Sequence, residues 1–174
     1  MVSPADDWKE AAFAAFVANQ ARQNALEQRR RFQRGEFTLE LIASDDDPPP
    51  RDAAFQQELT AFSAELHAAG VGHSQRALSL DSAEAHGYPI PEFILALQVL
   101  APPAMGVIGV AAGAWIQARY GRKVRLKVGD VEAEGRSVEE VEALLEMART
   151  YRIAEAAEAS TSTVADRGGP GVQS

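Results

Sequence analysis

The pattern of hydrophobic and polar positions predicts an alternation of helices and strands. Apolar residues recur at helical spacing within residues 52–69, which predicts a helix with one buried stripe. Strict alternation in residues 36–43 predicts a strand, and residues 123–128 and 131–135 predict a hairpin that turns at Gly129 and Asp130. The stripe of the helix consists of Phe55, Leu59, Phe62 and Leu66.

The order of these elements predicts an α/β (α+β) fold, with a small mixed sheet and helices packed on it. The expected order is α-β-α-β-α-β-β-α, with a weaker strand at 73–80 and a polar link at 81–91. Three regions follow from this reading. They are a long N-terminal helix within residues 1–35, an α/β domain at 36–159, and a low-complexity tail at 160–174 that we expect to be disordered.

The first helix is predicted to run from Pro4 to Arg34, because a serine and a proline begin it and Gly35 follows it. Acidic residues near its start and arginines near its end favour the helix dipole. Its first half carries Trp8, Phe13 and Phe16 among alanines, whereas its second half is rich in Gln, Asn and Arg. We therefore expect the first half to be able to dock and the second half to be solvated.

The most unusual segment is an Ala/Gly-rich apolar stretch, Phe93–Ile116, whose one polar side chain is Gln98. Its length would suit a membrane span, and Gly109 and Gly113 form a small-residue pair that lets helices approach closely. However, the pair Pro102-Pro103 is expected to split it into two short helices, at 93–100 and 104–120. A buried or partner-facing helix is the favoured interpretation, and membrane association is the alternative.

Composition narrows the function classes. The 174-residue chain has a formal net charge of −8, which disfavours nucleic-acid binding. It contains no cysteine, which excludes thiol nucleophiles, thiolate metal sites and disulfides and fits a cytoplasmic location. The N-terminal residues do not resemble a signal peptide, so secretion by that route is not expected.

A basic group follows the apolar stretch and continues along one face of the next strand. This group could contact phosphate or anionic lipid. The simpler interpretation is a solvated strand face that Glu132 and Glu134 neutralise across the hairpin. The group consists of Arg119, Arg122, Lys123, Arg125 and Lys127.

No pattern predicts a catalytic residue, a metal site or a cofactor site. The histidines, His67, His73 and His86, lack the spacing of a helical metal site, and the acidic run 45–47 does not match a calcium loop. Phosphate-loop, dinucleotide-binding and serine-hydrolase motifs do not occur. We therefore expect a protein that is not an enzyme.

The region from about Phe37 to Ala148 resembles the effector-associated constant component family of bacterial proteins. The resemblance implies an accessory part of a bacterial conflict or immunity system, encoded beside an effector, with no catalytic residues to transfer. The helix 4–34, the tail and the Pro102-Pro103 pair depart from the pattern. The residues that carry the resemblance are Met105-Gly106, Trp115-Ile116, Arg119, Arg122, Lys123–Val128, Val131–Ala133 and Val138–Met147.

The sequence thus predicts a non-enzymatic accessory or adaptor protein that acts through contacts with another protein or with itself. The alternative is a membrane-associated component anchored through Phe93–Ile116. Aromatic clusters often mark the centre of an interface, and small residues allow close approach. The expected partner interface is Trp8, Phe13, Phe16, Gly106, Gly109, Gly113 and Trp115.

Overall fold

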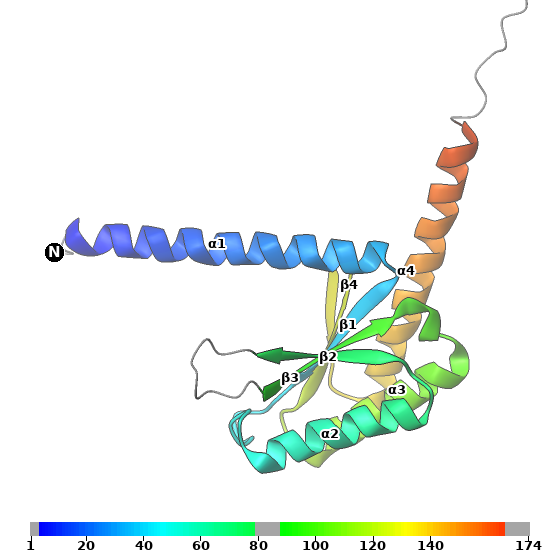
Figure 1. Ribbon diagram of the computed structural model, residues 1–174, viewed down its shortest axis with the longest axis horizontal. Helices are drawn as coiled ribbons and strands as arrows, with labels where there is room; N and C mark the ends of the chain where they lie inside the picture. The colour runs from blue at the N-terminus through cyan, green and yellow to red at the C-terminus, as the bar shows by residue number, and fades with distance from the viewer. Residues whose placement is uncertain (1–3, 79–87, 166–174) are drawn as a thin grey trace, which may run out of the picture.

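A computed structural model describes residues 4–78 and 88–165 of the chain. The predicted α+β class is confirmed, and all the predicted strands are present (Figure 1). The helices are α1 (Pro4–Gln33), α2 (Ala53–Ala68), α3 (Pro102–Ala118) and α4 (Val138–Ala165), with a short 3₁₀ turn η1 (Leu97–Val99). The strands are β1 (Glu36–Ile42), β2 (His73–Leu78), β3 (Tyr88–Ala96), β4 (Lys123–Val128) and β5 (Val131–Gly135).

The five strands form one sheet in the order β2-β3-β1-β4-β5. Each of the four strand pairings is antiparallel, where the sequence suggested a mixed sheet. The central strand β1 places Leu39 opposite Phe93 on one side and opposite Leu126 on the other. Residues directly opposite each other on paired strands point to the same face of the sheet, so these three side chains share one face.

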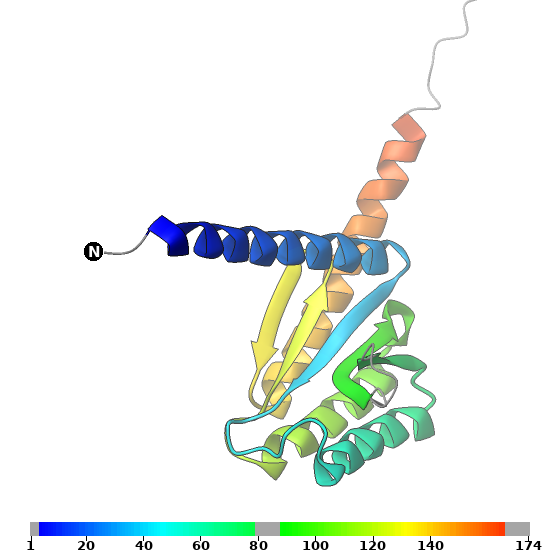
Figure 2. The same ribbon diagram turned by 60° about the vertical axis from the view of Figure 1, so that its left-hand side comes forward.

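Three helices cover that apolar face, and α1 lies against the other face (Figure 2). The predicted stripe of α2 is buried, since Phe55, Leu59, Phe62 and Leu66 are at most 4% exposed. Asp52 caps this helix by accepting a hydrogen bond from the backbone N–H of Ala54. The opposite face of the sheet carries the charged residues of the strands, and α1 packs against it.

Strand β3 was not predicted. Its first residues belong to the segment interpreted as a polar link, and its last residues belong to the segment interpreted as a short helix at 93–100. The two prolines of β3, Pro89 and Pro91, favoured a loop, yet neither lies where β3 pairs with β1. Residues 81–87 of the expected link lie outside the described part of the chain.

The Ala/Gly-rich stretch therefore spans the end of β3, the turn η1 and most of α3, rather than two helices. The predicted break at Pro102-Pro103 is confirmed, because these prolines occupy the first turn of α3. Phe93, Leu95 and Ile108 are fully buried in the core. Among the described residues, no helix has the length and apolarity needed to cross a membrane.

Helix α4 ends later than the sequence suggested. It continues through Ala165, so residues 160–165 of the expected tail are helical. Its low apolar content after residue 154 gave no helical stripe, which is why the periodicity stopped early. Residues 166–174 lie outside the described part of the chain.

Candidate functional site

A continuous run of exposed side chains, with two phenylalanines in it, lies on α1. Every side chain from Lys9 to Leu26 is exposed, and we call this segment the arm (Figure 1). Phe13 is 69% exposed and Phe16 is 59% exposed. The predicted interface residues Phe13 and Phe16 are therefore accessible, whereas the side chain of Trp8 is not among those the structure describes. The expectation that the second half of α1 is solvated is wrong for its last turns, since Arg31 is 5% exposed. Docking of the first half on a partner stays a prediction.

The last turns of α1 hold the helix on the sheet through a buried polar network. Arg31 is 5% exposed, and its Nη1 donates hydrogen bonds to Thr38 Oγ1 at 3.0 Å and to Glu92 Oε1 at 3.2 Å. Arg76 from β2 donates to the other oxygen of Glu92 at 2.9 Å. Gln28 Oε1 accepts from the Thr38 hydroxyl at 3.2 Å. One carboxylate thus joins α1 to two strands of the sheet.

A second set of contacts joins α1 to the turn between β4 and β5. Arg29 binds Asp130 in a bidentate ion pair, with Nε to Oδ1 at 2.7 Å and Nη2 to Oδ2 at 2.8 Å. The hydrogen bonds from Arg29 hold the pKa of the Asp130 carboxyl below its usual range. Phe32 lies against Gly129, and its ring centroid is 5.5 Å from that of Tyr151. These contacts fix the direction of α1 from its C-terminal end.

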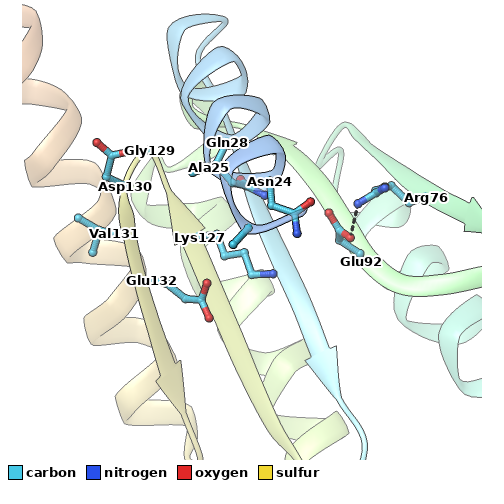
Figure 3. A pocket seen from close by; sticks show the side chains of 11 residues that line it. Asn24, Ala25, Gln28, Arg76, Glu92, Lys127, Gly129, Asp130, Val131 and Glu132 are labelled. Carbon is cyan, nitrogen blue, oxygen red and sulfur yellow. Dashed lines mark hydrogen bonds and ion pairs between the residues drawn. The ribbon is translucent and has the colours of Figure 1, made fainter. Parts of the chain in front are cut away.

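A cleft lies between α1 and the sheet, and we call it the α1 cleft (Figure 3). Its volume is about 600 Å³. Asn24 and Gln28 contribute to it from the helix, and Lys127 and Glu132 contribute from the sheet. The complete lining is Ala21, Asn24, Ala25, Gln28, Arg76, Glu92, Lys127, Gly129, Asp130, Val131 and Glu132.

The charged groups of the α1 cleft are engaged in ion pairs. Lys127 Nζ lies 2.8 Å from Glu40 Oε2, and Glu132 Oε1 lies 3.1 Å from the Nε of Arg125. No hydroxyl, imidazole or thiol lines the cleft, so its lining offers no nucleophile–base pair of the usual kinds. Within residues 4–78 and 88–165, no three His, Asp or Glu side chains form a group suited to a metal ion.

Three residues expected at a partner interface are instead packed inside the domain. A Cβ atom at Gly113 would overlap Val138 Cγ2, and one at Gly109 would lie 2.9 Å from Glu142 Cγ. The glycine-notched face of α3 therefore meets α4 of its own chain. Trp115 is 4% exposed and packs edge-on against Phe55. These three assignments are corrected, while Gly106 has open space beside it.

The basic group proposed for anions is neutralised within the chain. Arg125 pairs with Glu40, Glu132 and Glu134, and Lys123 pairs with Glu134. The simpler interpretation, a strand face neutralised across the hairpin, describes this geometry. The hydrogen bonds from Lys123 and then from Arg125 hold the pKa of Glu134 below its usual range.

Arg122 departs most from the anion-site hypothesis, because it is a core residue. It is 2% exposed, its Nε donates to Asp47 Oδ2 at 2.9 Å, and its Nη2 lies 2.6 Å from Glu58 Oε2. Its Cζ atom lies 3.8 Å from the centroid of the Trp115 ring. Arg119 also contacts Asp47, with its Nε 3.1 Å from Oδ1. Both arginines therefore hold the end of α3 to the loop before α2.

Asp47 is the acceptor at the centre of this cluster. Burial alone would raise the pKa of Asp47, but hydrogen bonds from Arg122 and Ser44 and the charge of Arg122 outweigh it and lower the pKa overall. The carboxyl is therefore ionised in the folded protein near neutral pH. The acidic run at 45–47 thus supplies a structural ion pair.

The histidines that the structure describes show no sign of a joint site. The ring of His73 forms hydrogen bonds with the Ser63 hydroxyl at 2.7 Å and with the Val71 carbonyl oxygen at 3.0 Å. His67 lies in the last turn of α2. His86 lies outside the described residues.

Comparisons with known proteins add no relative. No protein-family model matches the chain, and searches of curated proteins and of solved structures gave no match. The resemblance to the effector-associated constant component family therefore stays a prediction.

Sequence patterns missed the residues that anchor α1 and α3. Arg31 and Asp47 sit among other charged residues, and nothing local distinguishes a buried charge from a solvated one there. Glu92 instead lies between Pro91 and Phe93. Position along the chain was the one available signal that Glu92 and Arg31 lie close to the core. Glu92 lies one residue before the buried Phe93, and Arg31 lies four residues before the turn at Gly35.

Proposed function

We propose that this chain is a non-enzymatic accessory protein, located in the cytoplasm, that binds another protein chain through the arm. One observation carries the proposal. A helix of 30 residues binds its domain through the side chains of its last turns, and its earlier turns expose two phenylalanines. Large exposed apolar patches on proteins commonly mark interaction sites, and aromatic residues are enriched at the centres of interfaces.

The energetics of an isolated helix support this proposal. Helical segments without tertiary packing are only marginally stable in water, even when alanine favours them. The arm contains seven alanines, which favour the helical conformation. Helix propensity does not explain why Phe13 and Phe16 are present. A partner that buries Phe13 and Phe16 would stabilise the arm and remove their apolar surface from water.

The role in a bacterial conflict or immunity system rests on the resemblance alone. It adds the expectation that the partner is an effector encoded nearby, and the binding proposal does not depend on it. The Ala/Gly-rich stretch contributes core side chains, so we do not extend the proposal to membrane anchoring through it.

The test uses the full-length chain and a double variant, Phe13→Glu with Phe16→Glu. Tagged versions are purified from the native host, and co-purifying chains, including untagged copies of this protein, are identified by mass spectrometry. We expect a chain that the original sequence retains and the variant loses. The control is Val110→Glu, which changes an apolar side chain on α3 that is 66% exposed. Identical partners for all three proteins would contradict the proposal.

A further inference from the structure

We infer that the partner of the arm is a second copy of this chain, and that the two arms pair in antiparallel orientation. This inference rests on the proposed function, because it names the occupant of the same surface. It is carried by the exposure of the arm together with the distribution of charge along α1.

The charges of α1 are separated by sign. Residues 4–18 contain Asp6, Asp7 and Glu10 against Lys9, which gives a net charge of −2. Residues 19–33 contain four arginines, at 22 and 29–31, against Glu27, which gives a net charge of +3. Arg29 and Arg31 are held by Asp130 and Glu92 of their own chain, so Arg22 and Arg30 are the arginines that the acidic half of an antiparallel copy would meet. Parallel pairing would instead place like charges together. Complementary charge of this kind sets the orientation of an interface.

The charge balance of α1 is also compatible with the arm as the contact between copies. The whole chain has a net charge of −8, so two copies repel each other at most orientations. Helix α1 carries four acidic and five basic residues, a net charge of +1, and is therefore nearly neutral. Contact through the arms keeps the two acidic domains at a distance from each other.

The geometry of α1 leaves room for this pairing. The arm projects beyond the domain in both views (Figures 1 and 2). Its 18 residues, 9–26, extend about 27 Å at about 1.5 Å per residue. An antiparallel pair has a two-fold axis at its midpoint, near Val17, and forms a closed dimer in which both copies use the same patch. The start of one arm then lies near the α1 cleft of the other copy.

The absence of cysteine allows a direct test of orientation. Val17 and Glu10 are both exposed and lie seven residues apart, on the same face of α1, so single cysteines at these positions face the same partner. Near the two-fold axis, Val17→Cys is expected to form a disulfide-linked dimer under mild oxidation. In the same dimer two copies of Glu10→Cys lie about 22 Å apart along the helices and do not link. Linking of both variants would indicate parallel arms and overturn the inference.

The oligomeric state is measured in parallel by sedimentation equilibrium over a range of concentrations. We expect a dimer, and we expect Phe13→Glu with Phe16→Glu to raise the dissociation constant at least about tenfold. Val110→Glu is the matched control and should remain dimeric. Circular dichroism melts show whether each variant is folded.

The outcomes separate this inference from the proposed function. A monomer at every concentration, without linking at Val17→Cys, overturns self-pairing. If a different protein still co-purifies with the original sequence and not with the arm variant, the binding function stands with another partner. If no protein depends on the arm in either experiment, both the inference and the proposed function fail.

Discussion

Helices α1 and α3 invite comparison, because the sequence makes both of them candidates for an interface. Helix α3 is the more apolar, with glycines that permit close approach, and the protein uses these glycines to pack α3 on α4. Helix α1 is the more polar, and it exposes Phe13 and Phe16. The glycines of α3 therefore indicate a close approach of two helices, but not whether the second helix belongs to the same chain. The phenylalanines of the arm do not belong to a longer helical stripe, and they indicate apolar side chains that the domain itself does not bury.

The largest expected effect concerns the ion pair at the end of α3. Replacing Asp47 with Ala leaves the buried Arg122 with only the partly exposed Glu58 as its carboxylate partner. Removing one partner of a buried pair costs about 3–5 kcal/mol in the free energy of unfolding. Urea denaturation followed by circular dichroism measures this loss. Asp46→Ala, at an exposed neighbour, should stay within about 0.5 kcal/mol of the original sequence.

The ion pair between Asp47 and Arg122 predicts that the stability of the protein depends on pH in the acidic range. The pKa of Asp47 is lower in the folded protein than in the unfolded chain, so its stabilising contribution is complete above the unfolded pKa of about 3.9. It is lost as the pH falls through the lower, folded pKa. Asp47→Asn should therefore show a shallower loss of stability below about pH 4 than the original sequence. Equal slopes for the two proteins would exclude this role of Asp47.

The root of α1 should respond differently from the arm. Arg31→Ala removes the guanidinium that Thr38 and Glu92 share, and we expect a loss of about 2–3 kcal/mol because a buried carboxylate loses a partner. Backbone amides of α1 should then exchange with deuterium faster than those of α3. Arg30→Ala, at an exposed position one residue away, serves as the control. Unchanged exchange in α1 would show that Arg31 does not anchor it.

Replacing two glycines of α3 with alanine should change the stability of the protein in opposite directions. Gly113→Ala introduces a Cβ that overlaps Val138, which should cost about 1–2 kcal/mol. Gly106→Ala meets no atom within 4 Å and should stabilise the helix by about 0.5–1 kcal/mol. Thermal melts of the two variants measure both effects. A destabilising Gly106→Ala would indicate that this glycine has a contact outside the chain.

The smallest effect is expected on the arm. Phe13→Ala should change the unfolding free energy of the monomeric domain by no more than about 0.5 kcal/mol, because the side chain is 69% exposed. Phe55→Ala, in the core, should cost about 3–5 kcal/mol. Urea denaturation at low protein concentration compares the two. A large loss for Phe13→Ala would mean that the arm folds back on the domain.

The sequence predicted elements with a clear period and failed where the period was masked. The stripe of α2, the hairpin of β4 and β5 and the break before α3 followed from residue spacing and turn chemistry. Strand β3 was missed because Ile94, on its polar face, is also apolar, so the alternation around Phe93 and Leu95 could not be recognised. The burial of Arg122 could not be predicted either. Arg122 and Arg125 both belong to one basic segment, and nothing in that segment marks Arg122 as the buried arginine.

The position of β1 in the sheet has a consequence for biosynthesis. This strand is made early, yet both of its neighbours come later, since Leu39 pairs with Phe93 and with Leu126. Strand pairings between residues far apart in the sequence form slowly, because the intervening chain loses conformational entropy before the contacts form. While the ribosome translates the intervening residues, both edges of β1 stay open to mispairing. Helix α1 precedes every strand of the sheet in the chain, so the arm leaves the ribosome before the strands that complete the sheet.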